Sequence, residues 1–476
     1  MLKKIFLMKK IISLAIVCCL FATSALAQSK TAYFMDGYNY RHELNPAASP
    51  YRGYINLMGH YAIGVNSNLS ATQFLYPNAD GSELYTFLHP EVSASDFLNK
   101  LHDNNILGLN TDIDIFGFGF NARRGYFSFD TKLHMGLSSN LPKELFAFLK
   151  QGMSSDHTVY DIRNFNVSAS AYASAGIGYA YDLFDNLRIG VKAKYIVGLA
   201  AANANIDQMR VDMSSDAWTV NTQATMSAYG HGLRPLTGTI DENGNEVPTD
   251  YITGLEFTGV ETLAPAGKGF AFDFGLCYSP IKKLKLSAAL TNVGSIRWDA
   301  EAVINAQSTG EVAFSGLTLD LEASGEDAIA QLGEDISNNL INMIQFKQIA
   351  QQGAAVQKLD SRLLLAADYK PFRGLNAGLI YTLENTAYGQ FDELTASANI
   401  SLLKDLQLAG SYTLFSDYGR SFGLALNFCS LIYLSWDHIL THFSPQFVPL
   451  DVLSTQFEVG LRLCYRLRQY RRYECI

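Results

Sequence analysis

Long runs of this chain alternate between apolar and polar residues, and this period of two constrains the fold more than any other feature of the sequence. From Leu187 to Tyr195 every second residue is apolar, whereas Arg188, Lys192 and Lys194 stand at intervening positions. Successive side chains point to opposite faces only in a β-strand. Similar runs cover residues 127–137, 270–278, 406–414 and 457–465. The chain is therefore predicted to be all-β, with strands that have one apolar and one polar face.

Four short segments with a shared pattern connect such runs. Each contains an apolar residue, two mostly polar residues and a leucine, and the matching pairs are Phe184/Leu187, Ile281/Leu284, Phe372/Leu375 and Leu403/Leu406. Short connections between alternating runs predict antiparallel hairpins. A sheet of consecutive hairpins keeps two open edges unless it is covered or closes on itself.

The N-terminus predicts export. Lys9 and Lys10 precede an apolar run over residues 11–22, and residues 25–27 (ALA) form a small-x-small cleavage site. This pattern is typical of a signal peptide, which we predict over residues 1–27 with cleavage near Ala27. The remaining chain has no second stretch of about 18 apolar residues, which argues against an ordinary transmembrane helix but not against a transmembrane barrel.

The lengths of the connections predict which rim of a barrel faces outward. If the strand that starts at Gly53 runs outward, the turn at 121–125 and the four hairpin segments share one rim, and the long connections 67–110, 139–163, 230–267 and 299–359 share the other. Short inner turns and long outer loops are typical of outer-membrane barrels. We predict a closed antiparallel transmembrane β-barrel in the cell outer membrane, with about 16 strands. If residues 203–213 and 217–229 form a hairpin above the rim, the count is 14.

Two segments of the predicted extracellular loops have helical patterns. Residues 140–149 begin with Asn140 as the expected cap, and residues 325–349 place apolar side chains near one face. These faces pack either into the barrel mouth or against a membrane or a partner.

The predicted organisation has four parts: the signal peptide (1–27), an N-terminal periplasmic or plug segment (28–52), the barrel (53–466) and a basic C-terminal tail (467–476). Bacterial barrels commonly end on a strand with a terminal aromatic residue, and this chain continues beyond such a point. The tail is either a periplasmic extension or a sign that the last strand is misassigned.

Charged residues on the polar faces of the strands are the candidates for the barrel lumen. They carry both signs, and buried charges need partners, so we expect a plugged or salt-bridged interior rather than a strongly ion-selective pore. The candidates are Asp130, Lys132, His134, Arg188, Lys192, Lys194, Asp273, Glu458 and Arg462.

The charge balance argues against nucleic acid as a partner. The chain has a formal net charge of −9, and loss of the four lysines of the signal peptide leaves about −13. Four cysteines remain after cleavage, and they lack metal-type spacing: Cys277, Cys429, Cys464 and Cys475.

Catalytic and metal-binding motifs occur without their usual context. Residues 419–423 match G-x-S-x-G, but that motif needs a strand-turn-helix elbow and a nearby base, and here it lies at a hairpin. His438 and His442 lack the glutamate of a zincin motif. Residues 241–246 lack the remaining ligands of a calcium loop and suit a hairpin tip. We predict no catalytic residue, no metal site and no cofactor, and the protein is not expected to be an enzyme.

The segment GYNYRHELNPA at residues 37–47, which ends in Asn45, Pro46 and Ala47, precedes the first predicted strand. With the signal peptide, the hairpins and the loop asymmetry, it resembles Bacteroidota outer-membrane barrels of the FadL-like, PorV-like and PorP/SprF-like group, and within that group a barrel family of unknown function. In FadL-like proteins this segment lies near the start of an N-terminal plug that takes part in gating. The resemblance therefore implies a gating role for Asn45, Pro46 and Ala47. The alternative is a turn that seals the barrel floor, because proline fixes the bend.

These observations support more than one function. The first hypothesis is a non-catalytic barrel that binds or passes a small, hydrophobic ligand. The alternative is a scaffold, or an accessory of protein secretion that binds a secretion-system protein through its long loops. A membrane-embedded hydrolase has only the motif around Ser421 in its favour. Outer-membrane lipid and the barrel assembly machinery are the further expected partners.

Overall fold

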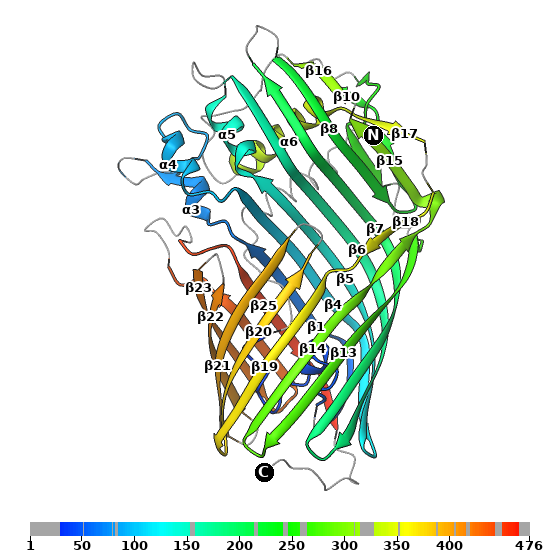
Figure 1. Ribbon diagram of the computed structural model, residues 1–476, viewed down its shortest axis with the longest axis vertical. Coiled ribbons are helices and arrows are strands. Elements are labelled where there is room, and N and C mark those ends of the chain that lie inside the picture. The colour runs from blue at the N-terminus through cyan, green and yellow to red at the C-terminus, as the bar shows by residue number, and fades with distance from the viewer. Residues whose placement is uncertain are drawn as a thin grey trace.

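A tall barrel with additional strands and helices above one rim makes up the computed structural model of this protein (Figure 1). The structure describes residues 29–50, 52–78, 80, 84–152, 158–213, 218–240, 246–257, 264–308, 310–314, 328–350, 353–386, 389–403, 406–415, 419–442 and 450–465. The predicted signal peptide and basic tail lie outside these residues.

The wall of the barrel is a closed antiparallel sheet of 14 strands, which confirms the predicted fold. In chain order the wall strands are β1 (Gly53–Ser67), β4 (Asn104–Ala122), β5 (Gly125–Pro142), β6 (Val159–Phe184), β7 (Leu187–Asp212), β13 (Gly267–Ile281), β14 (Leu284–Trp298), β19 (Ser361–Phe372), β20 (Leu375–Asn385), β21 (Gln390–Leu403), β22 (Leu406–Phe415), β23 (Gly419–Phe428), β24 (Ile432–Ile439) and β25 (Thr455–Leu461), which β26 (Leu463–Tyr465) continues. The sheet closes because β1 pairs with β4 on one side and with β25 and β26 on the other.

The wall has 14 strands, the lower of the two predicted counts, because β7 leaves the wall before it ends. β7 pairs with β13 only from Leu187 to Gly198. From Ala201 onward it pairs with β8 (Trp218–Tyr229), and β8 then pairs with loop strands instead of β13. These two segments form the hairpin above the rim that was the alternative.

The four repeated segments close hairpins at a single rim, here called the turn rim. Their matching residues are direct cross-strand partners: Phe184 with Leu187, Ile281 with Leu284, Phe372 with Leu375, and Leu403 with Leu406. The opposite rim, here called the loop rim, carries the long connections (Figure 1). Loop lengths therefore segregate as predicted.

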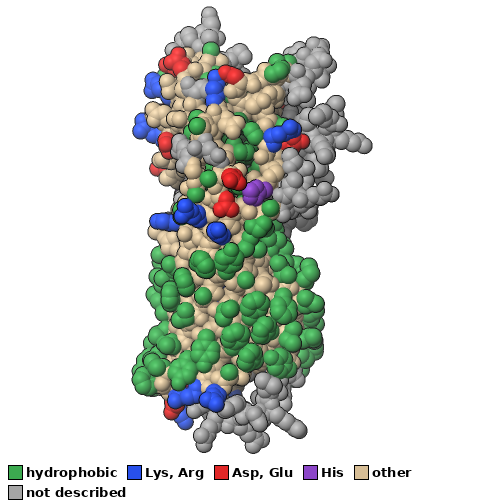
Figure 2. Space-filling model, turned by 90° about the vertical axis from the view of Figure 1, so that its right-hand side faces the viewer, with side chains coloured by type: hydrophobic (Ala, Val, Ile, Leu, Met, Phe, Trp, Pro, Cys, Tyr) green, Lys and Arg blue, Asp and Glu red, His purple; other side chains and the backbone are tan. Residues whose placement is uncertain are grey.

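The outer face of the wall is an apolar belt (Figure 2). On β13, Phe270, Phe272 and Phe274 are exposed, whereas Ala271 and Asp273 between them are buried. This alternation is expected when one face meets lipid and the other a filled interior. None of the described helices is long and apolar enough to span a membrane.

The connections above the loop rim form a layer with its own apolar core. Its elements are α3 (Ala71–Phe74), β2 (Leu75–Pro77), β3 (Leu84–Thr86), α4 (Ala94–Leu98), α5 (Lys143–Gln151), β8, β9 (Leu233–Leu236), β10 (Gly238–Ile240), β11 (Glu246–Pro248), β12 (Gly254–Phe257), η2 (Ala300–Ala302), β15 (Val303–Ser308), β16 (Gly310–Phe314), α6 (Ala328–Ile344), β17 (Phe346–Ile349) and β18 (Ala355–Lys358). Phe97, Phe148 and Met343 are fully buried in this core.

The two predicted helices exist with different ends. Asn140 does not cap the first, because it belongs to β5 and donates to the Asn164 carbonyl, and α5 begins after the extended Pro142. The second, α6, is shorter than expected because residues 346–349 form a strand. Both helices pack their apolar faces into the loop core, which is one of the two predicted alternatives.

Candidate functional site

A segment of polar and aromatic residues fills the interior of the barrel. Residues 29–50, which include the short helix α2 (Arg41–Leu44), are buried almost throughout, and we call them the plug. Buried polar groups require partners, so the inner wall must supply them. It does so at three places: a charged cluster around α2, a glycine-lined contact at Asn45–Ala47, and carboxylates that hold the first plug residues.

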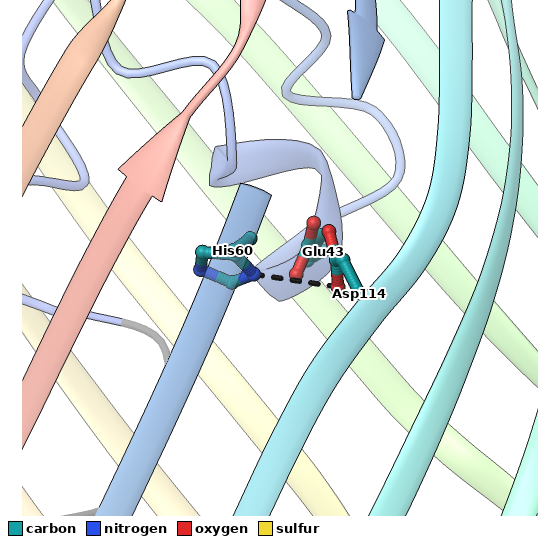
Figure 3. Close-up of side chains that lie close together, drawn as sticks. All are labelled: Glu43, His60 and Asp114. Atoms are coloured by element: carbon teal, nitrogen blue, oxygen red, sulfur yellow. Dashed lines mark ion pairs between the residues drawn. The ribbon is translucent and has the colours of Figure 1, made fainter. Parts of the chain in front are cut away.

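The charged cluster surrounds Glu43 of the plug, which lies beside His60 of β1 and Asp114 of β4 (Figure 3), and it also includes Lys132 of β5 and Arg462. The Lys132 ammonium contacts the carboxylates of Glu43 and Asp114, in the latter case at 2.8 Å. The Arg462 Nη2 donates to Glu43 Oε1 at 2.8 Å and to Asp114 Oδ2 at 3.2 Å. All four side chains are almost completely buried, so each depends on the others for its charge balance.

His60 extends the cluster to the last wall strand. Its Nε2 lies 2.6 Å from Glu458 Oε1, and its Nδ1 lies 3.3 Å from Asp114 Oδ1. Both ring nitrogens thus face carboxylate oxygens, and only a protonated imidazole carries a hydrogen on each. A protonated His60, with Lys132 and Arg462, would balance the three carboxylates of Glu43, Asp114 and Glu458.

Glu43, His60 and Asp114 are also close enough to hold a metal ion, since their ligand atoms lie within 4.8 Å of one another. The ammonium of Lys132 and the guanidinium of Arg462 already contact both carboxylates. With a protonated His60, three cationic side chains already balance three carboxylates, so a divalent cation would leave excess positive charge in the buried cluster. We therefore interpret the cluster as a clasp between plug and wall.

Arg462 also contacts the backbone of the plug and two aromatic rings. Its guanidinium lies 3.4 Å from the ring centroid of Tyr40 and 4.1 Å from that of Tyr54. Its Nη1 also donates to the carbonyl of Asn39 at 2.8 Å. One side chain thus contacts the plug backbone, a plug carboxylate and a plug ring.

Asn45, Pro46 and Ala47 lie against the wall at two glycines. A Cβ on Gly190 would lie 2.4 Å from the nitrogen of Ala47, and one on Gly275 would lie 2.2 Å from Asn45 Oδ1. The amide of Asn45 stabilises the turn by accepting from the nitrogen of Ala47 at 2.9 Å. The structure therefore places the three predicted gating residues in direct contact with the wall, and their role in gating stays a prediction.

Carboxylates of the last wall strands bind the start of the plug. The backbone nitrogen of Ser29 donates to Glu458 Oε2 at 2.6 Å, and that of Lys30 donates to Asp437 Oδ2 at 2.8 Å. The ammonium of Lys30 contacts Glu393. Lys30 is buried, so its charge depends on this contact.

A small, open pocket lies beside Lys30 on the side of the loop rim. Two aromatic rings and three carboxylates contribute to its lining. The lining residues are Lys30, Asn66, Ser67, Thr382, Glu384, Phe391, Asp392, Glu393, Phe415 and Ser454. The plug forms part of this pocket through Lys30.

The predicted lumen residues do not meet at one site. Lys132, Glu458 and Arg462 join the clasp. Lys192 pairs with Asp130 at 2.6 Å and Lys194 with Asp273 at 2.7 Å, while His134 contacts Asp112, and Arg188 contacts Asp182 and Ser49 of the plug. The interior is thus ion-paired, mostly between neighbouring strands, and the Lys192–Asp130 pair bridges from β7 across β6 to β5.

Sequence reasoning missed several residues of the site, including Lys30, Glu43, His60, Asp114, Glu393 and Asp437. Asp112 and Asp114 could have been predicted as inner-face residues, because they alternate with the apolar Ile113 and Ile115. Glu43 had no signal of this kind, since the plug has no alternation.

A histidine lies beside Ser421, although the sequence predicted no base near this serine. Ser421 Oγ lies 2.8 Å from Nδ1 of His438, whose Nε2 lies 3.2 Å from Glu393 Oε2. Strand pairing brings β24 beside β23, which sequence spacing does not show. Ser421 nevertheless lies on a strand and not on an elbow, and Glu393 already binds Lys30.

Cys277, Cys429 and Cys464 are free thiols, and Cys475 lies outside the described residues. Most of the predicted hairpin tip at 241–246 also lies outside them, although β10 and β11 on either side pair with each other.

A family profile matches residues 46–437, from the proline at the wall contact to the aspartate that binds the first plug residues. It is described as a family of unknown function, DUF5723. This chain belongs to DUF5723. No curated protein sequence matches the chain.

Solved structures similar to this DUF5723 member are barrels of low sequence identity. The "TodX deltaS2S3 mutant monoaromatic hydrocarbon channel" has a TM-score of 0.42 at 9% identity, covering 94% of this chain and 96% of that one. The toluene transporter TbuX from Ralstonia pickettii has a TM-score of 0.41 at 8% identity, covering 94% and 95%. A FadL homologue from Pseudomonas aeruginosa has a TM-score of 0.38 at 11% identity, covering 93% and 95%. The resemblance to PorV-like, PorP/SprF-like and Bacteroidota proteins stays a prediction.

Proposed function

We propose that this protein is an outer-membrane barrel that binds or passes a small hydrophobic molecule without catalysis, and that the plug controls the route. The observation that carries the proposal is the plug itself. Residues 29–50 occupy the interior, and charged and hydrogen-bonding groups of the wall hold them from Ser29 to Ser49. The charged and polar side chains that join plug and wall can form hydrogen bonds with water when they separate. Movement of the plug therefore replaces these contacts with water contacts and does not leave the groups unpaired.

The pocket beside Lys30 supports the same proposal. Phe391 and Phe415 offer apolar surface at the loop rim, and the plug residue Lys30 lines the same space. A ligand that enters from the loop rim therefore contacts both wall and plug. A ligand in this space would lie against the ion pair of Lys30 with Glu393, so its presence would be sterically coupled to the position of the first plug residues.

The test is deletion of residues 28–50 in the mature protein, reconstituted in liposomes. We expect faster liposome swelling in sugar solutions, because the deletion removes the segment that fills the barrel, while far-UV spectra stay β-rich. Unchanged swelling in a folded deletion variant would reject the gating role and favour the scaffold alternative.

Ligand binding is tested separately with a small apolar fluorescent dye. Phe415→Ala should weaken dye binding, whereas Phe422→Ala should not, because Phe422 lies on the outer face of the adjacent strand. Equal dye binding by both variants would remove the pocket from the proposal.

The scaffold alternative is favoured by the loop layer, whose buried core gives the long connections a fixed shape. In that case a secretion-system protein would bind the loops and solute flux would be incidental. Contact with outer-membrane lipid and insertion by the barrel assembly machinery belong to both versions.

The third candidate function is a hydrolase, and the one observation in its favour is the contact of Ser421 with His438. Labelling by a fluorophosphonate probe that Ser421→Ala abolishes would support it and overturn the non-catalytic proposal. We expect no labelling, because the wall strand gives Ser421 no elbow and Glu393 is committed to Lys30.

A further inference from the structure

Three exposed cations lie together on the outer face of the barrel. Lys268 on β13 is directly opposite Arg297 on β14, and Lys358 on β18 is opposite Ser295, two residues from Arg297. Residues opposite one another in an antiparallel pair have Cβ atoms about 5 Å apart, and diagonal neighbours about 7 Å. All three side chains are exposed. We call them the basic cluster.

The basic cluster lies where the apolar belt ends. Along β13 the exposed belt runs from Ile281 at the turn rim to Phe270, and Lys268 is the next outward residue. The twelve residues from Phe270 to Ile281 on a tilted strand rise roughly 25–30 Å, close to the height of the apolar band of an outer-membrane barrel. On the side where Figure 1 places β18, Figure 2 shows Lys and Arg side chains directly above the belt. This height corresponds to lipid headgroups on the side of the loop rim.

The basic cluster has no ion-pair partner within the described part of the chain. Lys268, Arg297 and Lys358 have no ion pair or hydrogen bond from their side chains to a described residue. Other exposed cations beyond the loop rim do have partners: Arg163 with Asp161, Arg234 with Glu256, and Lys347 with Asp250.

Asp299 and Glu301 are the acidic residues that follow β14 along the chain, and they form no ion pair with the cluster either. Like charges placed directly opposite each other in a sheet are destabilising. A bound anion at this position would offset that cost.

We propose that the basic cluster binds the phosphate groups of a lipid headgroup in the outer leaflet. Lysine and arginine form short, charge-assisted hydrogen bonds with phosphate, and the apolar side chains Phe270 and Val356 beside them would contact the acyl chains. The proposal rests on the outer-membrane location in the proposed function but not on a ligand or on gating. Liposome swelling tests only the gating role of the plug, and lipid retention tests only the basic cluster. Failure of one proposal therefore leaves the other standing.

The experiment measures how much diphosphoryl lipid A the mature protein retains in neutral-lipid nanodiscs, by native mass spectrometry over a range of lipid A fractions. The variant is Lys268→Gln/Arg297→Gln/Lys358→Gln. The matched control is Arg163→Gln/Arg234→Gln/Lys347→Gln, which removes the same charge from ion-paired positions.

Each cation near an anionic surface contributes roughly fivefold to binding, so the triple variant should bind lipid A on the order of a hundredfold more weakly. The control should change it less than about threefold. Binding to dephosphorylated lipid A should be equally weak for all three proteins. The proposal would be overturned if the triple variant kept the wild-type affinity for lipid A, or if the control variant lost as much affinity. It would also be overturned if millimolar inorganic phosphate displaced the lipid.

Discussion

Arg462 shows how a single side chain can connect a plug to a wall. Its guanidinium contacts a plug carboxylate, a plug carbonyl and a plug ring from a position between β25 and β26. A buried cation of this kind cannot be removed cleanly, because the carboxylates of Glu43 and Asp114 stay behind.

Arg462→Met should therefore lower the free energy of unfolding by about 3–5 kcal/mol, or release the plug first. Arg462→Lys should lose less, because it keeps the charge but not the forked hydrogen bonds. Urea unfolding and protease sensitivity of residues 29–50 measure the two effects. Arg420→Met is the control, since Arg420 is exposed and has no described partner. Stability equal to the control would contradict the clasp.

Gly190 is the residue that most directly limits the position of Asn45–Ala47. Gly190→Ala should displace this part of the plug and leave the wall intact, because the new Cβ would lie 2.4 Å from plug backbone atoms. Faster liposome swelling with unchanged far-UV spectra is the expected result. Gly410→Ala is the matched control, because its Cβ would meet only the Gly423 carbonyl, at 4.0 Å. Identical swelling of the two variants would separate Asn45–Ala47 from gating.

At the scale of elements, the register of each strand decides which face meets lipid. On β25, Leu461 is exposed in the belt opposite Ile432, whereas Glu458 on the same strand is buried against the plug. A shift of one residue would bury Leu461 and expose Glu458 to lipid.

Leu461→Arg should thus lower the free energy of unfolding in lipid vesicles by about 2–4 kcal/mol. Leu461→Phe, which keeps an apolar side chain, should be close to neutral. If the arginine variant is as stable as the phenylalanine variant, position 461 does not lie in the hydrocarbon region.

At the scale of the whole molecule, the plug crosses the interior from the last strands to β6 and β7. It contacts Glu458 at one end and Arg188 at the other. Because the wall is a closed sheet, movement of the plug changes the route through the barrel without opening the wall itself.

A reversible cross-link tests this arrangement. Asn39 Nδ2 lies 2.9 Å from Sγ of Cys464, so Asn39→Cys should form a disulfide with that native thiol. Oxidation should then lock the plug and suppress any ligand-dependent increase in flux, and a reductant should restore it. Asn39→Ser is the control. Flux that is the same in the oxidised and reduced Asn39→Cys protein would show that the plug does not move during passage.

The sequence by itself determined the strands and their faces. Alternation assigns Lys192 and Asp273 to the inside and Phe270 to the outside, because side-chain direction in a strand depends only on local backbone geometry. The same local logic predicts that Phe184 and Leu187 close a hairpin. The helix over 325–349 and the Asn140 cap were predicted with inaccurate ends, since sheet pairing at the rim overrides weak local preferences.

Tertiary structure decided the strand count, the clasp and the contacts of Ser421. β7 continues above the rim because β8 pairs with it there, and no local pattern encodes that choice of partner. Glu43 meets Lys132 and Arg462, and His60 meets Glu458 across 398 residues of sequence, only once the barrel has closed. Long-range contacts depend on which strands become neighbours and on where the plug docks, and the physical reason is that the energies of closure and burial belong to the whole fold and not to any one segment.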